Sequence, residues 1–308
     1  MEHQRRLAKT VNNGAAAKMK RAYDAAQTSL TGKLRKLVGT GKKDTFTAHQ
    51  QRIVLAQVRQ GQAQISARLA GNMGPLSRTA QETALNGLTS TVSRLSRAYS
   101  GSEIILPVEE AGVFAGVIDQ SRSSLLKIHQ TSFARYGANL TQQVEQKLAV
   151  SLLSGETPLD AIDGIEDTLQ NEWWQGERIV RTEMSYAYNV THRDGIAESA
   201  EEIPELMQRW EEHCDEDGQP LDDRVAVDSI AMHGQVTEPE GLFYMPATAP
   251  YPDAKGKTAV PERLVGMSWE FPPNRPNDRS VLSPWMADWG IPGWRYVGGA
   301  RVPISTEE

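Results

Sequence analysis

Hydrophobic residues recur at every third or fourth position along the first half of the chain. Within residues 47–70 they are Val54, Val58, Ile65 and Leu69. A second stripe consists of Leu85, Leu88, Val92, Leu95 and Tyr99. This spacing gathers the apolar side chains on one face of a helix and indicates helices that pack against one another. We expect these stripes to form a helical core and not a cofactor site.

A third periodic stretch and several breaks complete this region. Residues 109–153 predict two helices or one long broken helix, ending at Gly155. Thr47 is the expected N-cap of the first stripe. Gly, Pro and Ser residues predict breaks at 39–41, 71–75 and 100–102. The sequence therefore predicts an extended helical bundle over residues 1–155.

Two further helices are predicted after this region. Thr157, Pro158 and Asp160 fit the N-cap, the first helical position and the third helical position of a new helix. A longer helix is expected from about residue 174 to about residue 200. Its shared face consists of Val180, Met184, Ala187 and Thr191.

Short strands are predicted beyond Pro204. Short apolar runs alternate there with Gly and Pro turns, at residues 205–210, 241–245 and 264–271. All seven tryptophans lie between Trp173 and Trp294. This pattern is typical of a small domain with short strands and long ordered loops. We therefore predict an α+β fold, with a helical region at 1–155 and a mixed α+β domain at 156–308.

Charge is distributed unevenly along the chain. Residues 1–100 contain 17 Lys and Arg against 4 Asp and Glu, a net charge of +13, whereas residues 151–308 contain 12 against 30, a net charge of −18. Such an asymmetry favours a basic region that binds DNA or an acidic partner, beside a domain that repels DNA. The alternative is a set of solvated basic helices without a ligand. The candidate contacts are Arg5, Arg6, Lys9, Lys18, Lys20, Arg21, Lys33, Arg35, Lys36, Lys42 and Lys43.

Composition excludes several classes of protein. The single cysteine, Cys214, rules out an internal disulfide and an all-cysteine metal site, and it favours a reducing compartment. No run of eighteen apolar residues occurs, and the first ten residues lack the apolar core of a signal peptide. Neither a Walker A sequence nor a Rossmann fingerprint is present. We expect no cofactor, no bound metal and no membrane segment.

Residues 213–223, HCDEDGQPLDD, combine acidic side chains with the only cysteine. Their spacing is not that of an EF-hand, so an acidic hairpin loop after a strand at Trp210 is favoured over a calcium site. Adjacent residues of a strand point to opposite faces, which disfavours a direct pair of Cys214 with His213. His192 and His233 are interpreted as polar packing residues.

Three segments, taken in order, resemble one protein family. They are the helix ERIVRTEMSYAYN at 177–189, Trp210 followed by DDRVAVDSIAMHGQV at 222–236, and PPNRPNDRS at 272–280. Their order and spacing resemble the phage minor head proteins of the Mu F and SPP1 gp7 head-morphogenesis family, over about a third of the chain. The matching positions are Arg181, Thr182, Glu183, Ala187, Asn189, Trp210, Asp222, Arg224, Val225, Gly234, Val236, Pro272, Pro273, Pro276, Asn277 and Arg279.

The resemblance also identifies a departure. Many members of the family carry two cysteines in the second segment and two in the third. The corresponding residues of this chain are Ala226, Ser229, Asp278 and Ser280. A zinc site of four thiolates is therefore impossible, and hydrogen bonds and packing must hold the loops. We interpret PPNRPNDRS as a structural clasp, with Arg279 expected to pair with Asp222 or Asp223; the alternative is a recognition loop.

The resemblance implies a structural minor head protein of a tailed bacteriophage, acting in head morphogenesis and in DNA packaging or ejection. Its implied partners are the portal protein, the major capsid protein or scaffold, and packaged DNA, with no membrane while in the head. Its implied location is the capsid interior or portal vertex of the virion, after assembly in the host cytoplasm. The alternative is a metal-dependent hydrolase or nucleic-acid-processing enzyme that uses the acidic loops. The lack of a compact acid, base and nucleophile set in the sequence favours the non-enzymatic interpretation.

Overall fold

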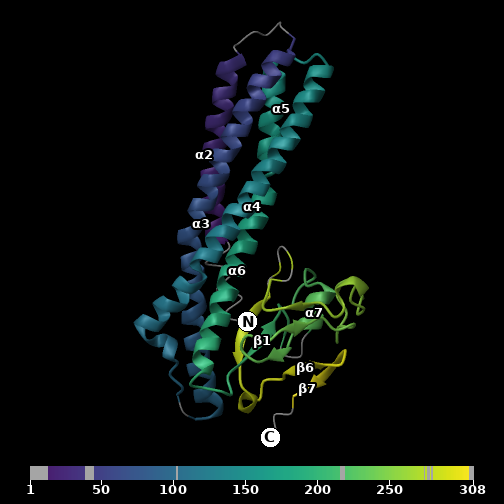
Figure 1. Cartoon of the computed structure of the whole chain (residues 1–308). Helices are drawn as coiled ribbons and strands as arrows, with labels where there is room; N and C mark the ends of the chain where they lie inside the picture. The colour runs from purple at the N-terminus through teal and green to yellow at the C-terminus, as the bar shows by residue number, and fades with distance from the viewer. Residues whose placement is uncertain are drawn as a thin grey trace. The chain divides into compact units, whose positions relative to one another are not determined.

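A computed structural model describes residues 13–38, 45–101, 103–215, 219–273, 275, 278 and 280–304. The fold is α+β, as predicted (Figure 1). The α-helices are α2 (Asn13–Val38), α3 (Ala48–Tyr99), α4 (Ala111–Leu153), α5 (Pro158–Asn171), α6 (Trp173–Ala200) and α7 (Val227–Met232). Single turns of 3₁₀ helix are η2 (Pro107–Glu109), η3 (Glu262–Leu264) and η4 (Ala287–Trp289).

Both predicted helix starts are confirmed. At the start of α3, Thr47 Oγ1 accepts the N–H of Gln50 at 3.2 Å, and Gln50 Oε1 accepts the N–H of Thr47 at 3.0 Å. At the start of α5, Thr157 and Asp160 form the same reciprocal pair, with Pro158 in the first turn. Each cap gives partners to backbone N–H groups that the helix itself leaves unpaired.

The predicted break at 71–75 is wrong, because α3 continues through Pro75. An internal proline costs a helix about 3 kcal/mol, since it removes one N–H and crowds the preceding turn. Met73 and Ala80, on either side of it, are fully buried. Packing of this continuous apolar face offsets the cost of the proline.

The other predicted breaks have different outcomes. The chain does leave the helix after Tyr99, where Gly101 has a φ of +69°. The stretch 109–153 contains one helix, α4 (Ala111–Leu153), and Gly155 follows it with a φ of +66°. The break at 39–41 lies outside the described residues.

The described chain divides into two compact units. A helical unit comprises residues 13–76 and 124–183, and a mixed unit comprises residues 77–123 and from 184 onward. This division differs from the predicted boundary after residue 155. The reason is that α3, α4 and α6 each contribute residues to both units, so α5 and the first half of α6 belong with the preceding helices.

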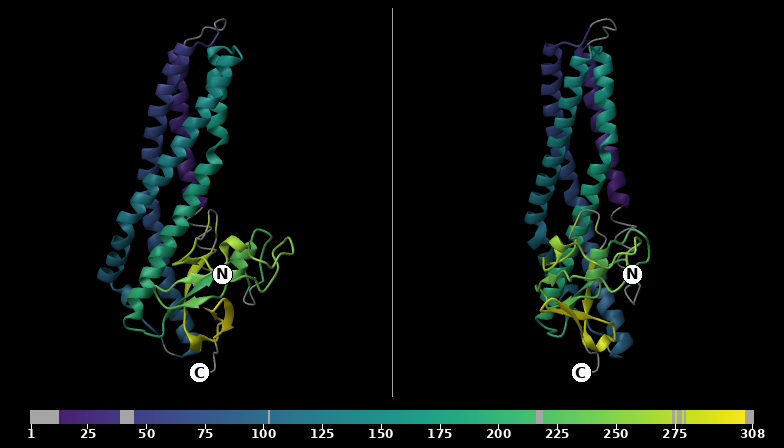
Figure 2. Two further views of the ribbon diagram at one scale, coloured as in Figure 1. Left: turned by 45° about the vertical axis from the view of Figure 1, so that its right-hand side comes forward. Right: turned by 90° about the vertical axis from the view of Figure 1, so that its right-hand side faces the viewer.

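The helical unit consists of long helices that run side by side (Figures 1 and 2). Within it α2 packs along α5. The Tyr23 hydroxyl donates to the carbonyl of Leu169 at 2.7 Å, and the rings of Tyr23 and Trp173 lie 4.8 Å apart. Its buried side chains include Met19, Leu34, Val54, Val58, Leu69, Phe133, Leu140, Val144, Leu148, Ile162 and Ile165. The predicted apolar stripe at 47–70 is thus part of the core.

The mixed unit holds the strands, which are short (Figure 2). A three-stranded antiparallel sheet has the order β2 (Val236–Thr237), β1 (Met207–Glu211), β5 (Val281–Trp285). Two further pairs are β3 (Phe243–Tyr244) with β4 (Ser268–Trp269), and β6 (Trp294–Val297) with β7 (Ala300–Pro303). In the central pair, Glu211 lies opposite Val281 and Trp210 lies opposite Leu282. Trp210 and Trp285 are fully buried in this unit.

The strand predictions are confirmed in part. The runs at 205–210 and 241–245 contain β1 and β3, whereas the run at 264–271 is a strand only at Ser268–Trp269. It begins in a 3₁₀ turn and passes through Gly266, whose φ of +76° is incompatible with a strand. Strands β2, β5, β6 and β7 were not predicted, since they are only two to five residues long and β5 and β7 each contain a proline.

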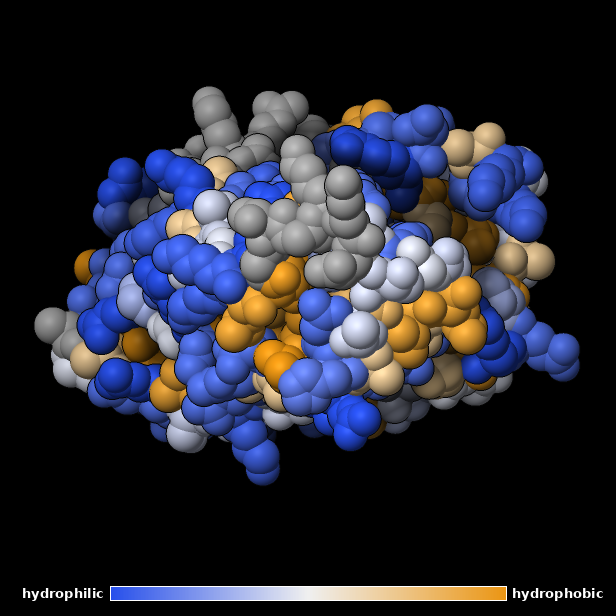
Figure 3. All heavy atoms as spheres, turned by 90° about the horizontal axis from the view of Figure 1, so that it is seen from above, coloured by the Kyte–Doolittle hydropathy of each residue, from blue (hydrophilic) through white to orange (hydrophobic). Residues whose placement is uncertain are grey.

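Hydrophobic side chains also reach the surface at scattered positions. Leu153 is 88% exposed, and Leu37 and Val150 are also exposed. Figure 3 shows several separate hydrophobic patches, in orange, among hydrophilic side chains, in blue. Such scattered residues are ordinary on protein surfaces and do not mark a site on their own.

Candidate functional site

The pairing of β1 with β5 brings a buried carboxyl group beside the proline-rich segment. Because Glu211 lies opposite Val281 in an antiparallel pair, Glu212 and Ser280 continue the register as neighbours. The Ser280 hydroxyl lies 2.6 Å from Glu212 Oε2 and 2.5 Å from Asp278 Oδ1. All three side chains are at least 94% buried. We call Glu212, Asp278, Ser280 and Ser229 the polar cluster.

Backbone groups complete the bonding of the polar cluster. The N–H of Ser280 donates to Asp278 Oδ1 at 3.0 Å, and the N–H of His213 donates to Glu212 Oε1 at 3.0 Å. Burial, together with the neighbouring charge of Asp278, raises the pKa of Glu212 to about 7. A buried carboxyl beside a second carboxyl prefers to keep its proton, because two adjacent charges in a poorly solvated site repel each other.

Three of the four positions at which many members of the Mu F and SPP1 gp7 family carry cysteine, according to the resemblance, lie in or beside this cluster. Asp278 and Ser280 contact each other, and the neighbouring Ser229 side chain favours the charged form of Glu212 and so acts to lower its pKa. Ser229 lies within α7, three residues after Ala226, which is the fourth such position and the N-cap of that helix. Hydrogen bonds centred on Glu212 therefore join the second and third segments of the resemblance.

The proline-rich segment is attached at a second point. Arg275 forms an ion pair with Asp228 and donates to the Ser229 hydroxyl at 2.6 Å. In the described part of the segment, Arg275 thus holds it to α7. Pro272 is buried and Pro273 is half-buried.

Asn277 and Arg279 lie outside the described residues, so the predicted pairing of Arg279 is not described. One of its expected partners, Asp222, forms an ion pair with Arg224 at 2.8 Å and lies 3.7 Å from His213. Arg224 itself is mostly exposed.

Asn189 joins α6 to β5. Its Oδ1 accepts the N–H of Leu282 at 2.9 Å, and its Nδ2 donates to the carbonyls of Ser280 at 3.2 Å and Ser185 at 3.0 Å. The side chain is fully buried. One amide therefore fixes the beginning of β5, next to the polar cluster, against the helix of the first resembling segment.

Gly234 and Trp210 are structural positions of the sheet. Gly234 has a φ of +80°, and a Cβ there would lie 3.4 Å from the Trp294 ring. Its N–H donates to the carbonyl of Trp210 at 2.9 Å. The Trp210 ring packs edge-on against Phe243 at 5.3 Å. A side chain at Gly234 would strain the backbone and crowd the indole of Trp294.

Arg181 and Glu183 belong to the helical unit, whereas the polar cluster belongs to the mixed unit. Arg181 is exposed and pairs with Glu177 at 2.6 Å. Glu183 is buried, 3.1 Å from the Nδ1 of His129 and 2.6 Å from the hydroxyl of Ser132 on α4. Glu183 therefore joins α6 to α4, and Arg181 lies on the exposed surface of α6.

The basic residues of α2 form an exposed face. Met19, Tyr23 and Leu34 are buried on the opposite side of the helix. Arg35 pairs with Asp163 and Glu166 of α5, at 2.7 Å each, and Lys20 pairs with Asp24 at 2.6 Å. The exposed basic residues are Lys18, Lys20, Arg21, Lys33, Arg35 and Lys36. The candidates Arg5, Arg6, Lys9, Lys42 and Lys43 lie outside the described residues.

Sequence reasoning missed the charged groups that surround Glu212. Arg209 pairs with Glu211 at 2.5 Å, and although burial opposes it, this pairing lowers the pKa of Glu211 to about 2. The Nδ1 of His233 accepts the N–H of Glu212 at 3.1 Å, and burial lowers the pKa of His233 to about 4. The available signal was the sequence Trp210-Glu211-Glu212, two acids at the end of a strand that begins as a buried run.

The acidic hairpin is confirmed for its described residues. Cys214 and Pro220 form an isolated antiparallel β-bridge through their backbones, and the N–H of Asp215 donates to the carbonyl of Gln219 at 2.8 Å. Cys214 is buried. Cavities of about 700, 480 and 440 Å³ occur in the described chain, and other residues line all three. In the part of the chain that the structure describes, no group of three or more His, Cys, Asp or Glu side chains is arranged to hold a metal ion.

No protein-family model, curated protein or solved structure matches this chain. None of the helices within the described ranges combines the length and hydrophobicity needed to cross a lipid bilayer.

Proposed function

We propose that this chain is a structural minor head protein of a tailed bacteriophage, of the Mu F and SPP1 gp7 type. The observation that carries the proposal is the meeting of Ser229, Asp278 and Ser280 around Glu212. The resemblance selected these positions from the sequence alone, as the sites of missing cysteines. About fifty residues separate Ser229 from the other two along the chain.

The chemistry of the cluster supports the same proposal. Four thiolates around a zinc ion would join two loops by metal bonds. Here the Ser280 hydroxyl bridges the Glu212 and Asp278 carboxyls, and Ser229 stands beside Glu212. The two sets of side chains perform the same task, since both tie the third segment to the second.

The arrangement of the three segments adds support. Asn189 of the first segment bonds the backbone on both sides of Val281, directly after the third segment. Gly234 of the second segment bonds Trp210. Asn189 therefore joins the first segment to the third, and Gly234 joins the two parts of the second, which suits a shared scaffold.

The carboxyl groups of the polar cluster are buried and already have hydrogen-bond partners, which favours a structural role over an enzymatic one. The Glu212 and Asp278 carboxyls are occupied by hydrogen bonds, and the cavities given above lie elsewhere. The proposed partners are the portal protein, the capsid or its scaffold, and packaged DNA through the basic face of α2. We propose no cofactor, and a location in the capsid interior or at the portal vertex.

Fractionation of phage assembly tests this function. An antibody against the full chain is applied to proheads, mature virions and free soluble protein from infected cells, separated on a gradient. We expect the chain in proheads and virions and expect it to copurify with the portal. Absence from both particles, together with metal-dependent cleavage of nucleic acid by the purified chain, would instead support the enzymatic alternative.

A further inference from the structure

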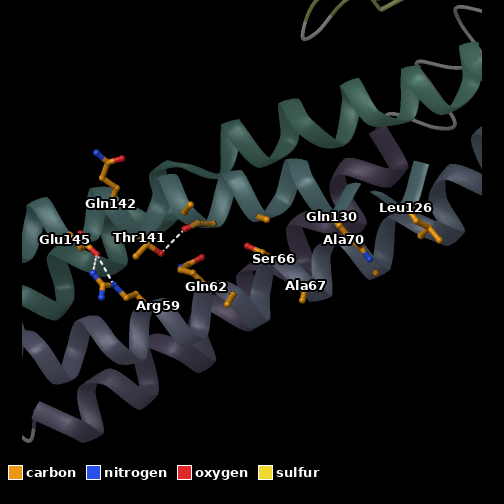
Figure 4. Close-up of a pocket in the computed structure, with 15 residues that line it drawn as sticks. Arg59, Gln62, Ser66, Ala67, Ala70, Leu126, Gln130, Thr141, Gln142 and Glu145 are labelled. Atoms are coloured by element: carbon orange, nitrogen blue, oxygen red, sulfur yellow. Dashed lines mark hydrogen bonds and ion pairs between the residues drawn. The ribbon is translucent and has the colours of Figure 1, made fainter. Parts of the chain in front are cut away.

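The three cavities differ in the balance of charge in their linings. In the largest, between α3 and α4, Arg59 and Glu145 pair with each other, with Arg59 Nε 3.0 Å from Glu145 Oε1 (Figure 4). In the second, each charged residue is likewise in an ion pair. The third, of about 440 Å³, lies within the mixed unit, and five glutamates but no Lys or Arg line it. We call this third cavity the Ile105 pocket.

Apolar side chains line the rest of the Ile105 pocket. They are Ile105, Leu106, Pro107 and Val113. Leu106 is buried in one core cluster with Ile196 of α6, which holds this segment against the helix. Ile105, by contrast, is 70% exposed. A large apolar side chain in a concave lining offers a partner apolar surface to remove from water.

The glutamates of the Ile105 pocket carry unbalanced negative charge. They are Glu109, Glu110, Glu198, Glu201 and Glu202, and all five are exposed. None of them forms an ion pair with a Lys or Arg among the described residues. Like charges that line one pocket repel each other, so a cationic partner is favoured there.

Three of these glutamates lie where α6 ends. Glu198 is in the last turn of the helix, Glu201 and Glu202 follow it directly, and that turn contains no basic residue. The C-terminus of a helix carries a partial negative charge, so carboxylates are unfavourable at this position. A cation bound here is attracted by the helix end as well as by the glutamates.

We infer that the Ile105 pocket binds a basic segment of a partner protein, in which an apolar side chain stands between lysines or arginines. The apolar side chain covers Ile105, and the cations face the glutamates. The volume of about 440 Å³ lies within the range of binding pockets, roughly 300–1,000 Å³. This inference does not depend on the proposed function in the phage head.

Other classes of ligand fit the Ile105 pocket less well. DNA is a polyanion and is repelled by the glutamates. A single metal ion needs converging oxygen ligands, whereas within the described ranges no three carboxylates converge in this way. Separate cations along one peptide match separate carboxylates, and the exposed isoleucine selects a peptide that also carries an apolar side chain.

Fluorescence anisotropy with the full chain tests this inference. The probe is a labelled peptide with a central leucine flanked on both sides by lysines. We expect a dissociation constant on the order of 10–100 μM at about 50 mM salt, and weaker binding as salt rises. A matched peptide with glycine in place of leucine should bind at least about fivefold more weakly. Equal binding of the two peptides would show that positive charge alone suffices and would overturn the inference.

A first variant tests the apolar contact. Ile105→Ser should weaken binding of the leucine peptide at least about fivefold, because the apolar surface that the peptide covers is lost. Val297→Ser, at an exposed position of β6 outside the pocket, is the control and should bind like the natural chain. Both positions are exposed, so neither variant should lose its fold. Unchanged binding by Ile105→Ser would overturn the inference.

A second variant tests the glutamates. Glu201→Lys combined with Glu202→Lys should weaken binding of the leucine peptide at least about tenfold. Glu238→Lys combined with Glu262→Lys, at exposed positions of the mixed unit outside the pocket, changes the net charge equally and is the control. Lysine is favoured at a helix C-terminus, so the pocket variant should melt no lower than the natural chain and keep its fold. A natural chain that does not bind the leucine peptide, or a pocket variant that binds it as tightly as the control, overturns the inference.

Discussion

At the scale of single residues, Ser280 has one hydroxyl proton and two carboxyl neighbours. It lies 2.6 Å from Glu212 Oε2 and 2.5 Å from Asp278 Oδ1, so it can donate to only one of them at a time. The second short contact needs another proton. The raised pKa of Glu212, about 7, assigns that proton to Glu212 below neutral pH.

This protonation has a consequence for stability that His233 opposes. The folded pKa of Glu212 lies above its ordinary value of 4.5. The stabilisation that its protonation gives the folded chain is therefore complete below pH 4.5 and is lost as pH rises to about 7. The folded pKa of His233 is lowered from 6.5 to about 4, so its contribution is complete above pH 6.5 and is lost as pH falls to about 4. Between pH 4.5 and pH 6.5 the two effects cancel in large part.

Glu212→Gln should remove this cancellation. We expect the unfolding free energy of the variant to rise with pH between about 4.5 and 6.5, by about 2–3 kcal/mol, while that of the natural chain stays nearly flat. Urea unfolding at half-unit steps of pH measures both. A variant that keeps the flat profile of the natural chain would show that Glu212 is ionised in the folded protein throughout this range.

Arg275 is the second residue with a testable role. Arg275→Ala removes the ion pair to Asp228 and the bond to Ser229, and should destabilise the chain by about 1–2 kcal/mol. Arg263→Ala, at a position without such a pair in the structure, is the matched control. Equal midpoints of denaturation for the two variants would mean that the proline-rich segment is held by packing alone.

At the scale of secondary-structure elements, the attachment of α6 to β5 depends on one amide. Asn189→Ala leaves the N–H of Leu282 and the carbonyl of Ser280 without their side-chain partner in a buried site, which should cost about 2–4 kcal/mol. Arg224→Ala, at an exposed position, should change stability by less than about 0.5 kcal/mol. Hydrogen exchange should localise the loss to β5. Uniform loss of protection across the chain would contradict this local role.

Elements with strong local signals could be predicted from the sequence, and those that depend on distant partners could not. Thr47 and Thr157 start helices because their caps are local. Pro75 lies inside α3 because burial on both sides outweighs a local penalty. β5 was missed since its pairing partner, β1, is about seventy residues away.

The same distinction applies to the candidate site. The resemblance identified Ser229, Asp278 and Ser280 as related positions, but Glu212 was not among them. Consecutive acids ordinarily lie on the surface. Glu212 is buried at the end of β1, which pairs with the distant β5, and that pairing cannot be read from the residues around it.

At the scale of the whole molecule, the charge asymmetry of the sequence is partly neutralised by folding. The acidic helix α5 packs along the basic helix α2, where Arg35 pairs with Asp163 and Glu166. The asymmetry is reduced but remains, since residues 13–76 and 124–183 contain 16 Lys and Arg against 11 Asp and Glu, whereas residues 77–123 and 184–308 contain 14 against 27. Lys33 and Lys36 remain exposed on α2 and are the better candidates for contact with DNA or an acidic protein.

We expect the full chain to bind duplex DNA without sequence preference, and more weakly as salt rises. Replacing Lys33 and Lys36 by Gln should lower the slope of log K against log salt by about 1–2, because two phosphate contacts release fewer counterions. Replacing Lys255 and Lys257, exposed in the mixed unit, is the control. If the affinity for isolated portal did not change with salt concentration, and no DNA bound at low ionic strength, the partner would instead be a protein.

The contribution of α3, α4 and α6 to both units also limits how this protein can be cut or exchanged. The chain enters the mixed unit at residue 77, returns to the helical unit at 124 and leaves it again at 184. One peptide cleavage cannot release either unit whole, and one genetic crossover cannot transfer either unit intact to another gene. In a lineage that evolves by recombination, the chain is therefore inherited as a single piece.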